Sequence, residues 1–204
     1  MIKMEVNLSI FRGKKTSAEH VASFLYSEWP RSEKNFRIAS LSKAASLPAG
    51  SLPAVVIMTV TRTNFKRRLE SLSQESKEGF NETLEQKENM PDDLVVIGHS
   101  RVDSARSDDS VDSATHTNEL SDGAAAIVFS VLIHPVFRKC GLGRVLMNHT
   151  EAVALAAGCS FVYLSTPDQE RFYTACGYSV SKAVSSLGQN AKRLNSTQVG
   201  TCWG

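Results

Sequence analysis

The pattern of apolar and polar positions predicts strands that alternate with helices. Apolar residues alternate with polar ones from Met4 to Ile10, which predicts a first strand. Apolar positions recur at helical spacing over residues 18–27, and Pro30 follows where that helix should stop, because proline disfavours helix at the residue before it. Runs of β-branched residues predict further strands over 53–63 and 94–99.

The second half of the chain predicts the most buried part of the sheet. Residues 124–133 read Ala-Ala-Ala-Ile-Val-Phe-Ser-Val-Leu-Ile, a run that is apolar on both faces of a strand and therefore belongs at the centre of a sheet. An apolar stripe at helical spacing follows over 141–157 and stops at Gly158. The remaining predicted elements are a strand over 161–165, a short helix over 168–176 and a strand that begins at Tyr178. The order β-α-β-β-β-α-β-α-β predicts an α/β fold with a mixed sheet and helices packed against it.

Two polar segments interrupt this pattern. Residues 66–93 are rich in Glu, Lys, Gln and Ser, and residues 103–122 combine aspartates and a glutamate with serines and threonines. Neither segment has enough apolar residues to bury a face of its own. We therefore expect one domain over residues 1–204, with mobile surface insertions at 66–93 and 103–122.

Composition narrows the class of protein without identifying it. The 42% of apolar and 22% of charged residues are ordinary for a globular domain, and a net charge of +2 does not indicate a nucleic-acid or membrane partner. The four cysteines have no metal-ligand spacing, so we expect no metal. The first residues lack a signal-peptide run, and no stretch approaches the ~20 apolar residues of a membrane span. We expect a reduced protein in the cytoplasm.

The turn between the buried strand and the next helix carries the strongest chemical signal. It reads Arg138-Lys139-Cys140-Gly141-Leu142-Gly143. A helix N-terminus exposes unpaired backbone N–H groups and the positive end of the helix dipole, and two glycines leave those groups open to a bulky anion. Arg138, Lys139 and Arg144 add mobile positive charge nearby. The turn therefore predicts a site for a phosphate or pyrophosphate.

Several phosphate-binding motifs can be compared with this turn. A Walker A loop needs Gly-Lys-Ser/Thr, but Gly143 is followed by Arg144-Val145, and a dinucleotide fingerprint needs a third glycine that is missing. The Arg-x-x-Gly-x-Gly pattern resembles the acetyl-CoA motif of the GNAT acetyltransferase superfamily. The turn by itself also permits an ordinary strand-to-helix connection with two flexible glycines.

A second segment supports the same resemblance. Residues 166–178 resemble the GNAT segment in which a Phe-Tyr pair, here Phe172-Tyr173, precedes a Gly-aromatic pair, here Gly177-Tyr178. With both motifs in the family's order, the chain is identified as a member of this superfamily. The resemblance implies the GNAT fold, an α/β architecture with a mixed, mostly antiparallel central sheet and helices on both faces. It also implies acetyl-CoA as co-substrate.

The resemblance assigns roles to individual residues. Tyr173 would be the general acid that gives a proton to the departing CoA thiolate, although a tyrosine that only packs the core fits the pattern too. No general base is evident, because Phe129 stands where members of the closer family can carry Glu; His99, His134 and a water relay stay open. The residues expected to bind acetyl-CoA are Val131, Leu132, Ile133, Arg138, Lys139, Cys140, Gly141, Leu142, Gly143, Arg144 and Gln169, and the backbone of the first three would hold the thioester oxygen.

The acceptor is suggested by Ser27-Glu28-Trp29-Pro30-Arg31-Ser32, which closely resembles a loop of the actin N-terminal acetyltransferases. This resemblance implies transfer to the α-amino group of an acidic N-terminus, that of processed actin. The fork of donors on Arg31 suits the carboxylate of a first Asp or Glu. The expected substrate-binding residues are Trp29, Arg31, Ser32, Ser165 and Thr166. A GNAT enzyme for small amines or lysine side chains, or a non-catalytic acetyl-CoA-binding module, remains an alternative.

The chain departs from that closer family at two places. Pro167 replaces a histidine of the family, which leaves Ser165 and Thr166 to supply polar groups to the acceptor groove. Some members also recruit profilin through a proline-rich loop, whereas the six prolines of this chain are scattered. The resemblance therefore implies actin as the substrate. Delivery of actin by profilin does not follow from it, because the chain has no proline-rich run that would recruit profilin.

Overall fold

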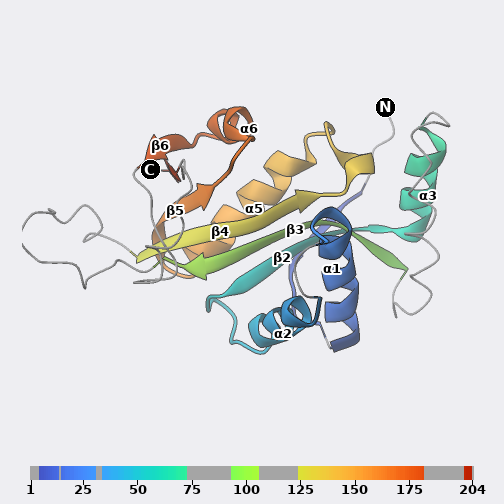
Figure 1. Ribbon diagram of the computed structural model, residues 1–204, viewed down its shortest axis with the longest axis horizontal. Coiled ribbons are helices and arrows are strands. Elements are labelled where there is room, and N and C mark those ends of the chain that lie inside the picture. The colour runs from blue at the N-terminus through green and yellow to red at the C-terminus, as the bar shows by residue number, and fades with distance from the viewer. Residues whose placement is uncertain are drawn as a thin grey trace, which may run out of the picture. The chain divides into compact units, whose positions relative to one another are not determined.

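The computed structural model describes residues 5–13, 15–30, 34–72, 93–105, 124–181 and 200–203. Figure 1 shows how helices and strands alternate along these residues. The elements are β1 (Asn7–Ile10), α1 (Lys15–Glu28), α2 (Lys34–Ala45), β2 (Ala54–Thr61), α3 (Arg62–Glu70), β3 (Leu94–Ser104), β4 (Ala124–Ile133), the 3-10 turn η2 (Pro135–Phe137), α5 (Leu142–Ala156), β5 (Cys159–Ser165), α6 (Glu170–Ala175), β6 (Ser179–Ser181) and β7 (Gly200–Trp203).

The strands form a mixed sheet in the order β1-β2-β3-β4-β5-β7-β6. β1 pairs antiparallel with β2, β4 pairs parallel with β5, and β7 pairs antiparallel with both β5 and β6. The amide of His134 donates to the carbonyl of Ile97 and that of Ala105 to the carbonyl of Ala125, a pattern that only antiparallel β3 and β4 can make. The predicted α/β fold with a mixed, mostly antiparallel sheet is confirmed.

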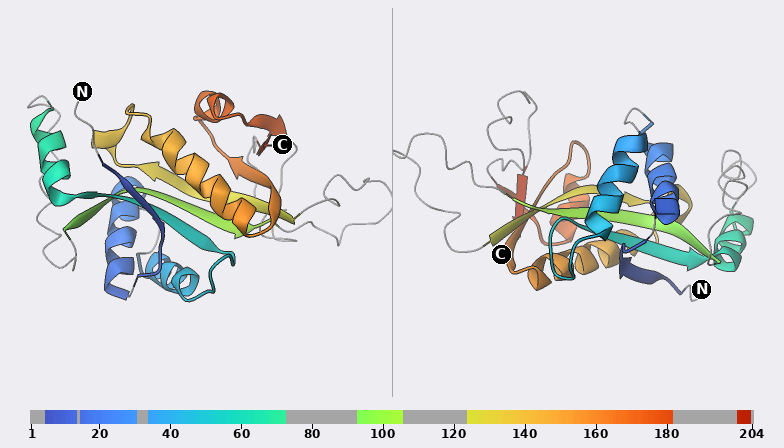
Figure 2. Two further views of the ribbon diagram at one scale, coloured as in Figure 1. Left: turned by 180° about the vertical axis from the view of Figure 1, so that it is seen from behind. Right: turned by 90° about the horizontal axis from the view of Figure 1, so that it is seen from below.

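The chain divides into two compact units, of which the first comprises residues 1–47, 55–99 and 132–146. Here α1 and α2 lie side by side on one face of β2 and β3 (Figure 2). The apolar positions of α1 recur at helical spacing and are buried, which is why this segment is a helix. Its core consists mainly of Phe11, Ala18, Val21, Ala22, Phe24, Leu25, Leu41, Ala44, Val55, Val96 and Leu132.

The second unit comprises residues 48–54, 100–131 and 147–204. There α5 packs along β4 and β5 (Figure 2). One face of β4 contributes Ala126 and Val128 to the core with α5, and the other contributes Ala125 and Ile127 to a cluster with Tyr163. β4 is therefore buried on both faces, as its unbroken apolar run predicts.

Three elements were not predicted: α2, α3 and β7. α3 covers residues 66–70, so the segment 66–93 is not all loop; Phe65 and Leu69, four positions apart, bury one side of this helix. The hydroxyl of Thr61 caps its N-terminus by accepting a hydrogen bond from the amide of Asn64 at 3.2 Å. Likewise the first residues of 103–122 complete β3. Residues 73–92 and 106–122 of the two predicted insertions lie outside the described residues.

Candidate functional site

A buried histidine shapes the chain where β4 gives way to the glycine turn. Nδ1 of His134 accepts a hydrogen bond from the amide of Val136 at 3.3 Å and so begins η2. The imidazole stacks on Phe24, with 6.2 Å between ring centroids, and meets Phe65 edge-on at 5.2 Å. Nδ1 therefore carries no proton. These contacts give His134 a structural role in placing the turn.

The glycine turn has the geometry that an anion site requires. Lys139 has a φ of 60° and Gly141 a φ of 78°, so the chain makes a left-handed turn before α5. A Cβ on Gly141 would find no described protein atom within 4 Å, which leaves space beside the start of the helix. Leu142 and Gly143 occupy the first turn of the 15-residue helix, where amides have no intrahelical acceptor. The open space, the amides and the helix dipole fit the pyrophosphate of CoA.

An arginine of α3 supports the turn. Nε of Arg68 donates to the carbonyl of Val136 at 3.1 Å, and a second guanidinium nitrogen lies 3.4 Å from Sγ of Cys140. Val136 is itself buried. Because α3 was not predicted, Arg68 was missed; the four-residue spacing of Phe65 and Leu69 was the available signal.

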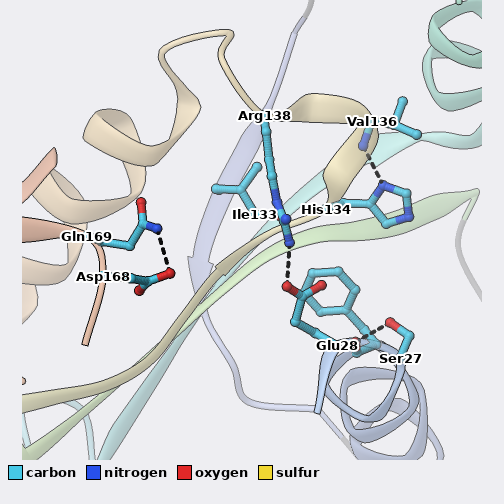
Figure 3. Close-up of polar contacts among 9 residues, drawn as sticks. Ser27, Glu28, Ile133, His134, Val136, Arg138, Asp168 and Gln169 are labelled. Carbon is cyan, nitrogen blue, oxygen red and sulfur yellow. Dashed lines mark hydrogen bonds and ion pairs between the residues drawn. The ribbon is translucent and has the colours of Figure 1, made fainter. Parts of the chain in front are cut away.

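Arg138 does not supply the mobile charge that the sequence predicted. Its Nε donates to the carbonyl of Ile133 at 2.9 Å, and another guanidinium nitrogen lies 2.8 Å from Oε1 of Glu28 (Figure 3). The side chain thus extends from the turn to the end of α1, and a contact at each of these two places holds it. This ion pair was not predicted, because a sequence does not show that the fold places a carboxylate beside the arginine.

The predicted acceptor loop is described only at its beginning. Trp29 is 38% exposed, and its carbonyl accepts a hydrogen bond from Arg37 at 3.4 Å. The guanidinium carbon of Arg37 also lies 5.7 Å from the centroid of the Trp29 ring, a cation–π distance. Arg31 and Ser32 lie outside the described residues.

In the second unit, Tyr173 is a buried side chain of α6. It is 7% exposed and meets Phe172 and Tyr178 edge-on, at centroid distances of 5.0 and 5.8 Å. Burial raises the pKa of Tyr173 to about 12, and Cys176 and Asp168 contribute in the same direction. The phenol therefore stays protonated at neutral pH, as a proton donor must.

A carboxylate and a phenol form a pair beside Tyr173. The hydroxyl of Tyr178 donates to Oε1 of Glu151, in α5, at 2.8 Å. Burial raises the pKa of Glu151, whereas the hydrogen bond from Tyr178 lowers it; burial also raises the pKa of Tyr178. The pair fixes the ring against which Tyr173 packs. Glu151 was missed because it lies on the polar side of α5, and only the apolar stripe of this helix was used to predict it.

The predicted residues before α6 have mainly local contacts. Oγ1 of the buried Thr166 accepts from the amide of Gln169 at 3.0 Å, and the side-chain amide of Gln169 donates to Asp168 at 3.0 Å (Figure 3). The carbonyl of Gln169 accepts from the amides of Phe172 and Tyr173. Thr166 and Gln169 therefore place the start of α6, while Ser165 ends β5 with an exposed side chain.

The backbone of β4 is irregular beside the residues expected to hold the thioester. Ser130 has a φ of 52°, in the left-handed region that a serine seldom adopts inside a strand. Such a residue disturbs regular pairing and re-aims the groups that follow it. Val131, which comes next, is half-buried, and Phe129 packs in the cluster of Ala125 and Tyr163. Nothing in the sequence of this strand predicts the irregularity, because serine does not favour a positive φ.

The described residues contain neither a cluster of metal ligands nor a helix that could span a membrane. No group of at least three His, Cys, Asp or Glu side chains gathers there in a way that could hold a metal ion. No described helix combines the length and apolar character needed to cross a bilayer. Cys140, Cys159 and Cys176 are not joined in disulfides.

Comparison with known proteins defines the class. Residues 76–178 match the family described as Acetyltransferase (GNAT) family, which is half of the chain. The chain belongs to this acetyltransferase family.

Individual relatives are more distant. The chain is 31% identical to N-alpha-acetyltransferase 80 of Mus musculus over 103 residues. The matched residues make up 50% of this chain and 28% of that protein, so the chain spans less than a third of that relative's length. Aminoglycoside N-acetyltransferase AAC(6')-Iy in complex with CoA is similar with a TM-score of 0.55 and 15% identity, covering 91% of this chain and 96% of that one. Glucosamine-6-phosphate N-acetyltransferase from Arabidopsis thaliana is similar with a TM-score of 0.51 and 12% identity, covering 87% and 95%. At such identities the two structures show the fold alone.

Proposed function

We propose that this chain is an N-terminal protein acetyltransferase of the cytoplasm. It would move the acetyl group of acetyl-CoA to the α-amino group of an acidic N-terminus, with processed actin as the protein substrate. The observation that carries this proposal is the 103-residue match to a mouse N-alpha-acetyltransferase. The loop from Glu28 to Ser32, similar to that of the actin N-terminal acetyltransferases, adds the acidic acceptor.

The chemistry of the acceptor agrees with a site that has no evident general base. An amine must be uncharged to attack the thioester carbonyl. A free α-amino group, with a pKa near ~8, is partly neutral at cellular pH, whereas a lysine near ~10.4 is almost fully charged. An α-amine therefore needs less help from a base than a lysine does.

Tyr173 has the protonation state that the second half of the reaction needs. As the C–N bond forms, the bond between the acetyl carbon and sulfur breaks, and the departing thiolate takes up a proton. With a pKa of about 12, Tyr173 holds its proton at neutral pH and can donate it. The half-buried ring of Phe172 and the buried ring of Tyr178 meet it edge-on and restrict its orientation.

Recognition of the acidic residue would fall to the loop that follows α1. Arg31 and Ser32 would donate to the first carboxylate of the acceptor. Trp29 at the start of the loop is fixed by the ring contact and the hydrogen bond of Arg37. Arg37 also brings a second guanidinium to the neighbourhood of this loop, which favours an acidic over a basic peptide.

The test is a comparison of acceptors with the purified chain and acetyl-CoA. Peptides that begin Asp-Asp-Asp or Glu-Glu-Glu should be acetylated faster than peptides that begin Met or Ser, and than an N-terminally blocked peptide with a free lysine. Preference for the lysine peptide would refute the α-amine, and no turnover with any acceptor would indicate a binding module. Mass spectrometry of the actin N-terminus in cells that lack the protein should show the unacetylated form if actin is the substrate.

A further inference from the structure

The ion pair between Arg138 and Glu28 joins the two segments that the proposed function assigns to donor and acceptor. Arg138 opens the glycine turn, and Glu28 is the last residue of α1, directly before Trp29. A guanidinium nitrogen of Arg138 lies 2.8 Å from Oε1 of Glu28. Figure 3 shows the side chain crossing from the strand end to the helix end. Both residues belong to the first unit.

The geometry of the pair is fixed from the side of the strand. Nε of Arg138 donates to the carbonyl of Ile133 at 2.9 Å, so the guanidinium plane is held before it meets the carboxylate. A guanidinium–carboxylate contact of this length is a charge-assisted hydrogen bond. An arginine that is anchored at one nitrogen loses less freedom when it binds with another.

Glu28 needs a cation where it lies. The C-terminus of a helix carries the negative end of the helix dipole, which disfavours a carboxylate there, and α1 has no basic residue in its last turn. Arg138 supplies that missing charge from a distant part of the sequence. With 44% and 33% of the two side chains exposed, the pair is accessible to salt and of modest strength.

We propose that Glu28 is a positioning residue, which uses Arg138 to hold Trp29, where the acceptor loop begins, beside the acetyl-donor turn. The role for the acceptor rests on the proposed function; the role in holding the loop does not. Loss of the carboxylate charge should free Trp29 and weaken acceptor binding, while the uncompensated charge of Arg138 should leave acetyl-CoA bound at the turn at least as tightly as in the parent.

The first experiment measures the loop without any substrate. The chain has two tryptophans, so Trp203→Phe leaves Trp29 as the single fluorescent reporter, one residue from Glu28. In this background, Glu28→Gln should lower the anisotropy of Trp29 fluorescence. Added salt should lower it in the parent and have little effect in the variant, because salt screens an ion pair but not an amide contact. Glu19→Gln is the matched control, since it removes the same charge from an exposed position of the same helix.

The second experiment measures steady-state kinetics with the acidic peptide. Glu28→Gln should raise the KM for the peptide by about two- to fivefold, as expected for a partly exposed pair, and should not raise the KM for acetyl-CoA. Equal anisotropy in Glu28→Gln and its parent, or an unaltered KM for an acidic peptide that the parent acetylates, would overturn the proposal. If the parent acetylates no acidic peptide, the proposed function fails while the anisotropy still decides the role of Glu28.

Discussion

Replacing Tyr173 by phenylalanine removes one hydroxyl and leaves the packing of the ring. The phenyl ring can keep its edge-on contacts with Phe172 and Tyr178, because the two side chains differ only in the oxygen. At neutral pH we therefore expect the variant to unfold at nearly the temperature of the parent. Its effects should appear in stability at high pH and in turnover.

The raised pKa of Tyr173 sets the size of the effect on stability. In the unfolded chain the phenol has a pKa near ~10, and in the folded protein it is about 12. Below pH ~10 the phenol is protonated in both the folded and the unfolded state, so its raised pKa costs no stability there. As the pH rises toward the folded-state pKa of about 12, the unfolded state ionises first and the folded protein loses stability. At pH 11 the unfolded state gains about 1.4 kcal/mol from ionisation of this group and the folded state almost nothing.

Tyr173→Phe should therefore resist alkali better than its parent. For a domain of this size 1.4 kcal/mol corresponds to about 3 to 6 °C, which the variant should gain in Tm relative to the parent at pH 11. Burial and Glu151 raise the pKa of Tyr178 in both proteins, and the variant loses only the smaller contribution of Tyr173 to that pKa. Scanning calorimetry at pH 7 and pH 11 measures the effect, and Tyr26→Phe, at an exposed position, should give no such gain.

The same substitution tests the chemistry. If Tyr173 gives its proton to the thiolate, kcat should fall about 10²- to 10⁴-fold, the usual contribution of a general acid, with the KM for acetyl-CoA little changed. kcat is measured with an acidic peptide as acceptor, by using a thiol reagent to follow the release of free CoA. An unchanged kcat together with the alkaline gain in Tm would show that Tyr173 is only a buried core residue.

Three further predictions concern the turn and the hydroxyl pair between β3 and α5. Gly141→Ala should cost about 1 kcal/mol of stability, because φ is 78°, and should weaken acetyl-CoA binding measured by calorimetry; unchanged affinity would mean that the open space is not used. Arg68→Met should raise the Kd for acetyl-CoA about tenfold, since the carbonyl of Val136 loses its charged donor, and an unchanged Kd would refute this support of the turn. Ser100 and Thr150 share a buried hydrogen bond of 2.6 Å, so Ser100→Ala should lower the free energy of unfolding by about 1 to 3 kcal/mol in chemical denaturation. The double variant Ser100→Ala/Thr150→Val should lose less than the sum of the two single variants, and strict additivity would argue against coupling.

The elements that were predicted closely are those with long, regular patterns. β4 runs over the predicted ten residues because its apolar run allows only a strand buried on both faces. α5 differs from its predicted range by one residue at each end, since its apolar stripe covers four turns. Both patterns are local, and a sequence shows them directly.

The missed elements depend on contacts that lie far along the chain. α2 buries only Leu41 and Ala44 fully and leaves Phe36 72% exposed, so its apolar stripe is short and weak. β7 is four residues long and exists because β5 and β6 pair with its two edges. Short elements of this kind gain their stability from tertiary packing, which overrides a weak local pattern.

The same distinction explains the site. The glycine turn could be predicted because glycines, a helix start and nearby charges stand together in the sequence, whereas the 68 positions between Arg68 and Val136 hide their contact. Arg138 shows the limit most clearly. Its place before two glycines indicates an anion ligand, but the direction of its side chain depends on Glu28, which the fold brings from the end of another helix. A basic residue in such a motif therefore adds to the anion site only when the fold leaves its charge uncompensated, and here the backbone amides and the helix dipole of α5 remain as the principal attraction.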